Sequence, residues 1–442
     1  MRKIEKAPDW FKDELYNKAT DLRKSQNFDH LINHINEQYM YWDKVKYQKT
    51  DPAIAPELIW TLTKLSRINS EKVKFGKHKF KFNLTNQIQR GLHEFDLHIG
   101  GNLGAKSVIP EDDKKRYLIS SIMEEAIASS QIEGAVTSRK KAKEMLRKNM
   151  TARNKSEQMI VNNYRTIKHI VDIQNEPITK DKIFEIHKLV TAQTLDDRED
   201  EGSLRMDNEI NVVDVIDGEV VYTPPDFKEV QGLMDELFVF FNGNNQSPFI
   251  HPIIKGCIIH FMIGYIHPFV DGNGRTARAL FYWYLLKNGY WLTEYLSISR
   301  LIVRSKNQYA QAFIYSEIDE NDLTYFIRYK IKTIQLAYNS LKEYIDKKIK
   351  EKRQLVNFQR IKGINERQAQ IMKWIYEEDL VFSVKEIENR FSVANQTART
   401  DLSELVNKGY LEEINLNKKT KGFCRPPNFE KLLKKELSTI AI

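Results

Sequence analysis

The chain has 442 residues, of which 41% are hydrophobic and 29% are charged, and its formal net charge is +9. This length exceeds what one compact core usually holds, so we expect two or three domains, and the composition excludes wholesale disorder. The basic excess favours acidic partners such as nucleotides or nucleic acid. Two distant cysteines, Cys257 and Cys424, exclude a disulfide framework and a zinc finger, and they predict a reducing cytoplasm.

No segment indicates a membrane protein. The first ten residues, MRKIEKAPDW, lack an apolar stretch and do not resemble a signal peptide. The most apolar segment, Cys257 to Val270, is shorter than the ~20 residues that a membrane span needs. We therefore expect a buried core helix there and no contact with a membrane.

Helical periodicity dominates the chain. Apolar residues recur at three- and four-residue spacing in segments 56–68, 115–132, 156–173 and 323–349. Asp226, followed three residues later by Glu229, resembles a capping box, and Asn242-Gly243 ends the helix that it opens. Asn288-Gly289 ends another helix, which begins near Arg275. The prediction is a mainly α fold.

One segment departs from this pattern. From Ile210 to Thr223 (INVVDVIDGEVVYT), β-branched residues flank Asp217-Gly218, which is a strong signal for a two-residue hairpin turn. Pro224-Pro225 ends the second strand, because proline cannot donate to the ladder. We predict a single hairpin on an otherwise helical protein.

The carboxyl-terminal part follows a long basic helix that extends past Lys342. Helices predicted at 366–376, 384–391 and 395–407, with a basic hairpin at 410–425, indicate a winged helix-turn-helix. The domain also carries acidic residues, so DNA binding and protein binding both stay open. The candidate nucleic-acid contacts are Gln396, Arg399, Thr400, Lys418, Lys419 and Lys421.

The segment from His267 to Arg278 (HPFVDGNGRTAR) has the residues of a polyphosphate site. Gly272 and Gly274 let the backbone turn its N–H groups inward, just before a helix begins near Arg275. Glycine-rich backbone at a helix N-terminus is an anion site by geometry and dipole.

The charged residues of this segment fit the same chemistry. Arg275 and Arg278 are three residues apart on the helix, where their forked donors can reach phosphate oxygens. The Asp271 carboxylate is suited to Mg²⁺ that bridges phosphates. His267 precedes the loop, and its ring can act as a base at neutral pH.

The segment matches the signature His-x-Phe-x-Asp/Glu-Gly-Asn-Gly-Arg-x-x-Arg at every fixed position, and the chain therefore resembles the Fic family of nucleotidyltransferases. The resemblance implies transfer of AMP from ATP to a protein hydroxyl, with His267 as the base and Asp271 as the Mg²⁺ ligand. It also implies that Asn273 contacts the α-phosphate, that the two arginines hold the β- and γ-phosphates, and that pyrophosphate leaves. The expected nucleotide-binding residues are Gly272, Asn273, Gly274, Arg275 and Arg278.

The resemblance makes the predicted hairpin the family's flap. An exposed strand edge can pair with an extended segment of the target and so place its hydroxyl against His267. The flap residues are Val212, Val213, Val221, Tyr222 and Thr223.

A second motif, SSQIEG at 129–134, fits the family's inhibitory pattern Ser/Thr-x-x-x-Glu-Gly/Asn. Glu133 lies near a helix C-terminus, where the macrodipole disfavours an anion and a cationic partner would offset the cost. By resemblance the partner is Arg278, and the salt bridge occupies the γ-phosphate position. The regulatory residues are Ser129, Glu133 and Gly134.

Together these patterns predict a cytoplasmic, autoinhibited protein adenylyltransferase that uses ATP and Mg²⁺. The expected domains are an N-terminal helical region at 1–105, a Fic-type core at 106–355 and a winged-helix domain at 356–442. The first region has helices and a polar stretch near Lys72 to Lys81, and it packs the inhibitory helix or forms a homodimer surface. The target hydroxyl belongs to Thr, Tyr or Ser of another protein or of the chain itself. The alternative is a nucleotide-sensing, DNA-binding transcriptional regulator, against which the intact His267 argues.

Overall fold

A computed structural model describes residues 4–25, 27–100, 114–213, 218–243, 248–377, 381–415 and 420–440. The chain divides into two compact units, Met1–Leu341 and Lys342–Ile442. Helices dominate both units, which confirms the mainly α class. The domain boundaries at residues 105 and 355 stay predictions. Within the described ranges, no helix combines the length and apolarity needed to cross a bilayer.

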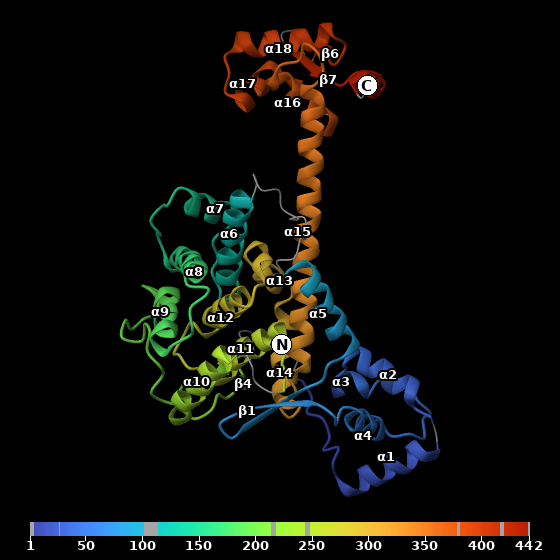
Figure 1. The fold of residues 1–442 in the computed structure, drawn as a ribbon, viewed down its shortest axis with the longest axis vertical. Coiled ribbons are helices and arrows are strands. Elements are labelled where there is room, and N and C mark those ends of the chain that lie inside the picture. Colours follow the sequence, from blue (N-terminus) through green and yellow to red (C-terminus); the bar gives the residue numbers. More distant parts are fainter. Residues whose placement is uncertain are drawn as a thin grey trace. The chain divides into compact units, whose positions relative to one another are not determined.

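Helices α11 and α12 form the centre of the first unit (Figure 1). Helix α11 (Pro252–Ile266) is apolar on all sides and buried along almost its whole length, as we predicted for this segment. Helix α12 (Asn273–Lys287) packs against it. Around the pair lie α6 (Lys114–Ile132), α7 (Arg139–Arg147), α8 (Lys155–Asp172), α9 (Lys180–Thr191), α10 (Phe227–Asn242), η2 (Trp291–Tyr295), α13 (Ile298–Arg304) and α14 (Lys306–Ile318).

A second hairpin shows that the prediction of a single hairpin was wrong. Strands β1 (Glu71–Phe75) and β2 (His78–Phe82) pair antiparallel around Gly76, whose φ is 55°. Apolar residues alternate with lysines here, and the rings of Phe75 and Phe80 pack on Phe240 and Tyr265 at centroid distances of 5.2 and 5.0 Å. The two-residue period is the strand signal. The high lysine content led to the prediction of a polar stretch instead.

The predicted capping box at α10 is half right. Asp226 caps the helix, because its Oδ1 accepts a hydrogen bond of 2.9 Å from the N–H of Lys228. The Glu229 side chain does not return to the cap. It contacts Lys77 and His78 of the second hairpin instead, at 2.9 and 3.2 Å.

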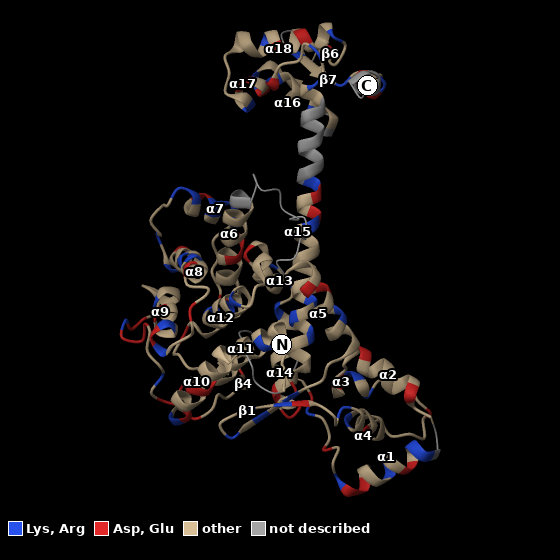
Figure 2. Ribbon diagram, viewed as in Figure 1, with Lys and Arg blue, Asp and Glu red and all other residues tan. Residues whose placement is uncertain are grey.

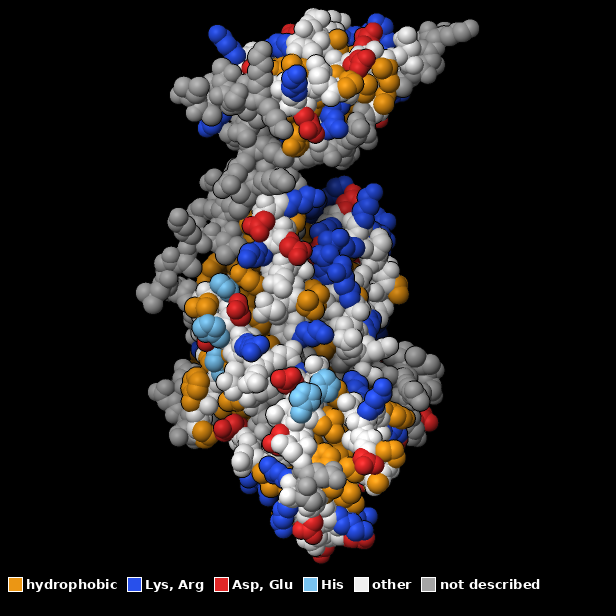
Figure 3. All heavy atoms as spheres, turned by 90° about the vertical axis from the view of Figure 1, so that its right-hand side faces the viewer, with side chains coloured by type: hydrophobic (Ala, Val, Ile, Leu, Met, Phe, Trp, Pro, Cys, Tyr) orange, Lys and Arg blue, Asp and Glu red, His pale blue; other side chains and the backbone are white. Residues whose placement is uncertain are grey.

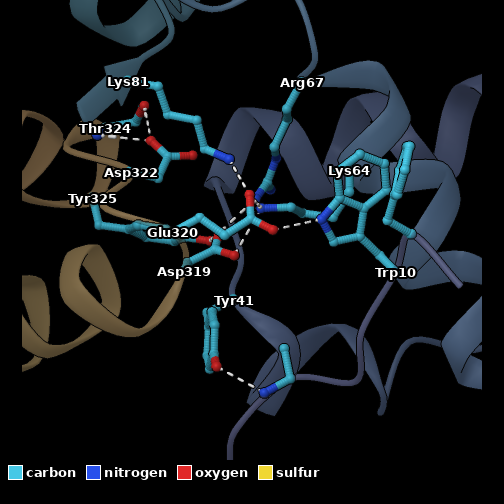
Figure 4. Close-up of polar contacts among 12 residues, drawn as sticks. Trp10, Tyr41, Lys64, Arg67, Lys81, Asp319, Glu320, Asp322, Thr324 and Tyr325 are labelled. Atoms are coloured by element: carbon cyan, nitrogen blue, oxygen red, sulfur yellow. Dashed lines mark hydrogen bonds and ion pairs between the residues drawn. The ribbon is translucent and has the colours of Figure 1, made fainter. Parts of the chain in front are cut away.

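The amino-terminal helices are tied to the rest of the first unit by a buried polar cluster. These helices are α1 (Asp13–Ser25), α2 (Asp29–Gln38), α3 (Trp42–Val45), α4 (Pro56–Ser66) and α5 (Asn86–His98). Figure 4 shows Lys64 of α4 pointing at the turn that follows α14. Lys64 Nζ lies 2.8 Å from Asp319 Oδ1, and the two side chains are only 3% and 4% exposed. Tyr325 donates to the other oxygen of Asp319 at 2.8 Å.

The same turn also holds the second hairpin in place. The N–H of Lys81 donates to the carbonyl of Asn321 at 3.2 Å, and the N–H of Leu323 donates to the carbonyl of Lys81 at 2.8 Å. Glu320 accepts from Lys81 and from Trp10 (Figure 4). Burial alone would raise the pKa of Glu320, but Lys64 and these two donors outweigh burial and lower the pKa to about 2.

A groove of about 1150 Å³ lies between α2, α5 and α15 (Thr324–Gln359), a helix that begins in the first unit. Amide side chains such as Asn33, Gln87 and Gln335 line it. On the face that Figure 3 shows, Lys and Arg side chains gather in one group, while acidic, basic and apolar side chains are mixed over the rest of the coloured surface. The groove includes no residue of the His267 to Arg278 loop.

The second unit is a winged helix-turn-helix, as predicted. It contains α16 (Glu366–Glu377), α17 (Val384–Phe391), α18 (Asn395–Asn407) and α19 (Phe429–Ile440). Strands β5 (Phe382–Ser383), β6 (Glu412–Asn415) and β7 (Lys421–Cys424) form a sheet in the order β5-β7-β6. Of the predicted nucleic-acid contacts, Lys418 and Lys419 lie outside the described residues. Gln396, Arg399, Thr400 and Lys421 are exposed.

We expect Lys64→Met to lower the free energy of unfolding of the protein by about 3 kcal/mol or more, because it leaves the buried Asp319 carboxylate without its cation. Urea denaturation followed by circular dichroism measures the change. Lys18→Met is the control, since Lys18 pairs with Glu14 on the exposed surface of α1. If the two variants were equally stable, the ion pair of Lys64 with Asp319 would not stabilise the protein as we propose.

Candidate active site

The loop between α11 and α12 begins with a constrained residue. His267 has φ = 49°, in the left-handed region that side chains with a Cβ rarely adopt. Arg205 fixes this conformation, because its Nε donates to the carbonyl of His267 and its N–H donates to that of Pro268, both at 2.9 Å. The clamp explains why the chain can leave α11 so sharply.

The His267 ring is oriented by the last turn of α11. Its Nδ1 lies 3.2 Å from the carbonyl of Gly264. A carbonyl only accepts, so Nδ1 carries the proton and Nε2 keeps a free lone pair. Burial lowers the pKa of His267 below its ordinary value, and the ring is neutral at neutral pH. These are the properties of a general base.

His187 of α9 supports the loop from below, and we did not predict it from the sequence. Its Nε2 lies 2.8 Å from the carbonyl of Asp271, and its Nδ1 accepts from the N–H of Gly202 at 2.9 Å. The ring stacks on Phe269, with centroids 3.7 Å apart. Burial lowers the pKa of His187 to about 4. The ring therefore stays neutral, with one nitrogen that donates and one that accepts. Gly272 is required here, since its φ is 83° and a Cβ would lie 2.6 Å from the side chain of Thr191.

Asn273 closes the loop on itself. Its side-chain oxygen accepts from the N–H of Phe269 at 3.0 Å, and its side-chain nitrogen donates to the carbonyl of Phe269 at 2.8 Å. The Asn273 side chain thus holds the loop backbone, and its main-chain N–H at the start of α12 is a further donor for an anion. The N–H groups of Asn273, Gly274 and Arg275 open α12, where a helix leaves its first donors without intrahelical partners.

Arg278 joins α12 to the end of α6, as predicted. Its Nη2 donates to Glu133 Oε1 at 2.8 Å, and its Nε donates to the Ser129 hydroxyl at 2.8 Å. The Arg278 side chain is 4% exposed and that of Glu133 is 30% exposed. Burial alone would lower the pKa of Arg278, but the negative charge of Glu133 outweighs burial and raises it. Gly134 follows in the left-handed region, with φ = 92°.

The Glu133 carboxylate lies directly over the start of α12. A Cβ on Gly274 would be 2.3 Å from Glu133 Oε1, so only glycine allows this approach. Arg278 Nη1 is buried, lies 3.2 Å from the same Cβ position and has no described hydrogen-bond partner. The Glu133 carboxylate therefore lies beside the first turn of α12 and is bonded to the Arg278 guanidinium, in a place where helix geometry favours an anion.

Arg275 is bonded differently from Arg278. Its Nη1 donates to the carbonyl of Val190 at 2.9 Å, and its Nη2 lies 3.4 Å from Asp271 Oδ2. Burial lowers the pKa of Arg275. The Asp271 side chain is 54% exposed at the mouth of the site.

The described residues contain no group of three or more His, Cys, Asp or Glu side chains that could hold a metal ion. A single carboxylate such as that of Asp271 is enough for Mg²⁺, because one or two carboxylates hold this ion in phosphate sites, with phosphates and water as the other ligands.

The hairpin predicted at 210–223 is present as two short strands, β3 (Val212–Val213) and β4 (Val220–Tyr222), and its role as a flap stays a prediction. They pair antiparallel with a register irregularity, and Val213 and Val220 are exposed. The Tyr222 hydroxyl donates to the carbonyl of Tyr265 at 2.9 Å, which ties the flap to the end of α11. Val221 belongs to β4, and Thr223 follows it. Of the predicted turn, Asp217 lies outside the described residues and Gly218 has φ = 71°.

Lys306 is a second contact that the sequence did not indicate. Its Nζ donates to the carbonyl of Gln131 at 2.7 Å, at the C-terminus of α6. A cation at a helix C-terminus complements the macrodipole. Lys306 thus steadies the helix end from which Glu133 projects.

Comparison with known proteins agrees with this geometry. Residues 177–285 match the model of the Fic/DOC family, and residues 367–414 match that of the DeoR-like helix-turn-helix domain. The chain is similar to the protein adenylyltransferase Fic of Drosophila grimshawi (29% identical over 109 residues) and of Drosophila melanogaster (32% identical over 118 residues). The matches cover 24% and 27% of this chain but only 20% and 22% of those proteins.

A solved structure is also similar in fold. The crystal structure of a Fic family protein from Desulfovibrio desulfuricans G20 aligns with a TM-score of 0.50 at 18% identity. The alignment covers 78% of this chain and 97% of that chain. At this identity the likeness supports the fold alone.

We expect the stability of the protein to fall as the pH drops from about 6.5 to about 4. The pKa of His187 is about 4 in the folded protein and about 6.5 in an unfolded chain. The unfolded state therefore binds more protons in this window, and the stabilisation, complete above pH ~6.5, amounts to about 3 kcal/mol. Urea denaturation across the window should give a shallower pH dependence for His187→Gln. If the free energy of unfolding of the variant fell as steeply with pH as that of the wild type, the prediction would be wrong.

Proposed function

Because this chain carries a Fic/DOC-family domain at residues 177–285, we propose that it is an autoinhibited protein adenylyltransferase. It transfers AMP from ATP to a Thr, Tyr or Ser hydroxyl of a target protein or of the chain itself. The observation that carries the proposal is the Glu133 carboxylate, held by Arg278 over the N-terminus of α12. A carboxylate placed there marks the site as one for anions.

The transfer step uses the geometry of the loop. His267 Nε2 takes the proton of the target hydroxyl, whose oxygen then attacks the α-phosphorus of ATP. The bond to the bridging oxygen breaks, and pyrophosphate leaves with the electron pair. The N–H groups at the start of α12 face the charge that develops on the phosphates, and preorganised donors of this kind carry most of the catalysis.

The charged side chains divide the remaining work. Arg278 offers Nη1 and Nη2 to the terminal phosphates, while Arg275 steadies Asp271 and the start of α12. Asp271 would hold Mg²⁺, which when bound neutralises phosphate charge. The flap strands β3 and β4 offer an exposed edge for an extended target segment, and Tyr222 holds that edge near His267.

Autoinhibition follows from competition for Arg278. While Glu133 holds the guanidinium, the terminal phosphate of ATP meets a carboxylate instead of a cation, so ATP binds weakly or in an unproductive orientation. Ser129 and Lys306 keep the end of α6 in this position. A cytoplasmic location and a homodimer remain predictions from the sequence.

A second function is favoured by one observation, the DeoR-like helix-turn-helix match at residues 367–414. Helix α18 exposes Gln396, Arg399 and Thr400 on one side, while its buried Asp401 pairs with Arg367 at 2.8 Å. An exposed polar helix face of this kind suits the major groove of DNA. In this reading the protein is a nucleotide-sensing transcriptional regulator.

Labelling with ATP tests the transferase proposal. With Mg²⁺ and ATP labelled on the α-phosphate, we expect Glu133→Gly to incorporate about tenfold more label into protein than the wild type, since it removes a charge-assisted hydrogen bond worth ~1.5–3 kcal/mol. His267→Ala should lower the rate in the Glu133→Gly background by about a hundredfold or more. Label from the γ-phosphate alone would indicate phosphate transfer. No label from either position would contradict the proposal.

DNA binding is tested on the full chain by fluorescence anisotropy with duplex DNA. If α18 enters the major groove, affinity should fall steeply with salt, and Arg399→Ala should weaken binding by about tenfold. Lys49→Ala, on the exposed surface of the other unit, is the control. If both variants bound DNA with equal affinity, the hypothesis of a DNA-binding transcriptional regulator would be excluded.

A further inference from the structure

The exposed face of the β1–β2 hairpin carries an unusual concentration of positive charge. Lys72 lies directly opposite Lys81, and Lys74 lies directly opposite Lys79. Like charges in cross-strand positions destabilise a hairpin. Glu320 pairs with Lys81, but no described carboxylate pairs with the other three lysines. Figure 2 shows the basic residues recurring along this hairpin.

The outer edge of β1 is open. Lys81 directs its N–H and C=O away from β1, toward Asn321 and Leu323. Residues opposite each other in such a pair both direct their main-chain groups outward, and this pattern alternates along the strands. Lys72 and Lys74 therefore point their N–H and C=O groups at the outer edge of β1. In the described ranges, nothing forms a hydrogen bond with them there.

A groove of about 320 Å³ runs along this edge, and charged residues (Lys72, Lys74 and Glu236) line it together with apolar ones. Its lining includes Val73 of β1, Phe240 of α10 and Ile250. Val239, which also lines the groove, is 65% exposed, and the neighbouring Phe249 is 79% exposed. The edge of β1 thus offers unpaired main-chain N–H and C=O groups next to exposed apolar side chains.

The hairpin is linked to the candidate active site. His78 Nδ1 lies 2.9 Å from the hydroxyl of Tyr265, and the flap residue Tyr222 donates to the carbonyl of that tyrosine. Tyr265 is two residues before His267. A polypeptide that docks on the hairpin is therefore tethered near the catalytic loop.

We propose that the open edge of β1 receives an extended acidic segment of a polypeptide as a third strand. The unpaired N–H and C=O groups match a peptide backbone, which is how strand addition gives affinity. The groove takes apolar side chains on one face of that strand, and the lysines take carboxylates on the other. In combination with the proposed function, the segment belongs to the target protein, and the enzyme selects targets with acidic extended segments.

The test is a binding measurement that needs no catalysis. A fluorescent peptide of four Val-Glu repeats is titrated with the full chain, alongside a Val-Lys peptide and single-stranded oligo-dT. We expect the Val-Glu peptide to bind, to be released by salt, and to bind more tightly than both others. Equal binding of the two peptides, or tighter binding of oligo-dT, would overturn the proposal.

Two variants separate docking from folding. In Lys72→Glu/Lys74→Glu, each new carboxylate faces a lysine across the hairpin, so the hairpin is stabilised while its attraction for acids is lost. We expect at least about tenfold weaker peptide binding without a lower melting temperature. Lys49→Glu/Lys140→Glu makes the same change in net charge at exposed sites elsewhere and should bind like the wild type.

Lys74→Pro tests the strand edge itself. It removes an N–H that points outward, a place where edge strands tolerate proline. Compared with Lys74→Gln, which removes the same charge but keeps the N–H, Lys74→Pro should bind the peptide about fivefold more weakly, the loss that one backbone hydrogen bond of ~1 kcal/mol gives. Unchanged binding would overturn strand addition. If the wild-type protein transfers AMP but does not bind the Val-Glu peptide, the docking site is refuted and the proposed function stands. If it binds the peptide but transfers no AMP, the proposed function is refuted and the docking site stands.

Discussion

The candidate site depends on one constraint, a permanent positive charge placed at the positive end of a helix. Arg278 is almost completely buried, and the unpartnered N–H groups of α12 face the same space. A charge in such a place needs an anion, because its own desolvation is costly and the helix dipole adds to its field. Glu133 supplies that anion in the structure. In the proposed function a phosphate group takes its place, so that the same contact also regulates the site.

The surrounding chain keeps this charged centre in one geometry. Arg205 and Asn273 fix the two ends of the loop through main-chain contacts. His187 fixes its middle as a neutral ring that both donates and accepts. All three act on backbone atoms, so the loop is held independently of the side chains that face the ligand. A preorganised site of this kind does not have to rearrange when charge develops.

The sequence predicted what lies in local patterns and missed what lies between distant segments. The loop, the ion pair of Glu133 with Arg278, the β3–β4 hairpin and the winged helix each have a short signature, and each is present. His187 and Lys306 had no such signature, because their partners are 84 and 175 residues away. The β1–β2 hairpin did have a local signal, a period of two residues around Gly76. Its lysines hid that signal, since a strand with one exposed face can carry charge at every second position.

If Glu133 competes with a nucleotide, as in the proposed function, the way in which it is attached to the chain has a consequence. Glu133 is a ligand on a short tether, and tethered ligands act at an effective concentration in the millimolar range or above. Because Ser129, only four residues earlier, bonds to the same Arg278, the tether has almost no slack. A free nucleotide must outcompete this local concentration whatever the amount of protein present. Diluting the protein leaves the competition unchanged, whereas a shift of the end of α6 by a few ångströms would abolish it.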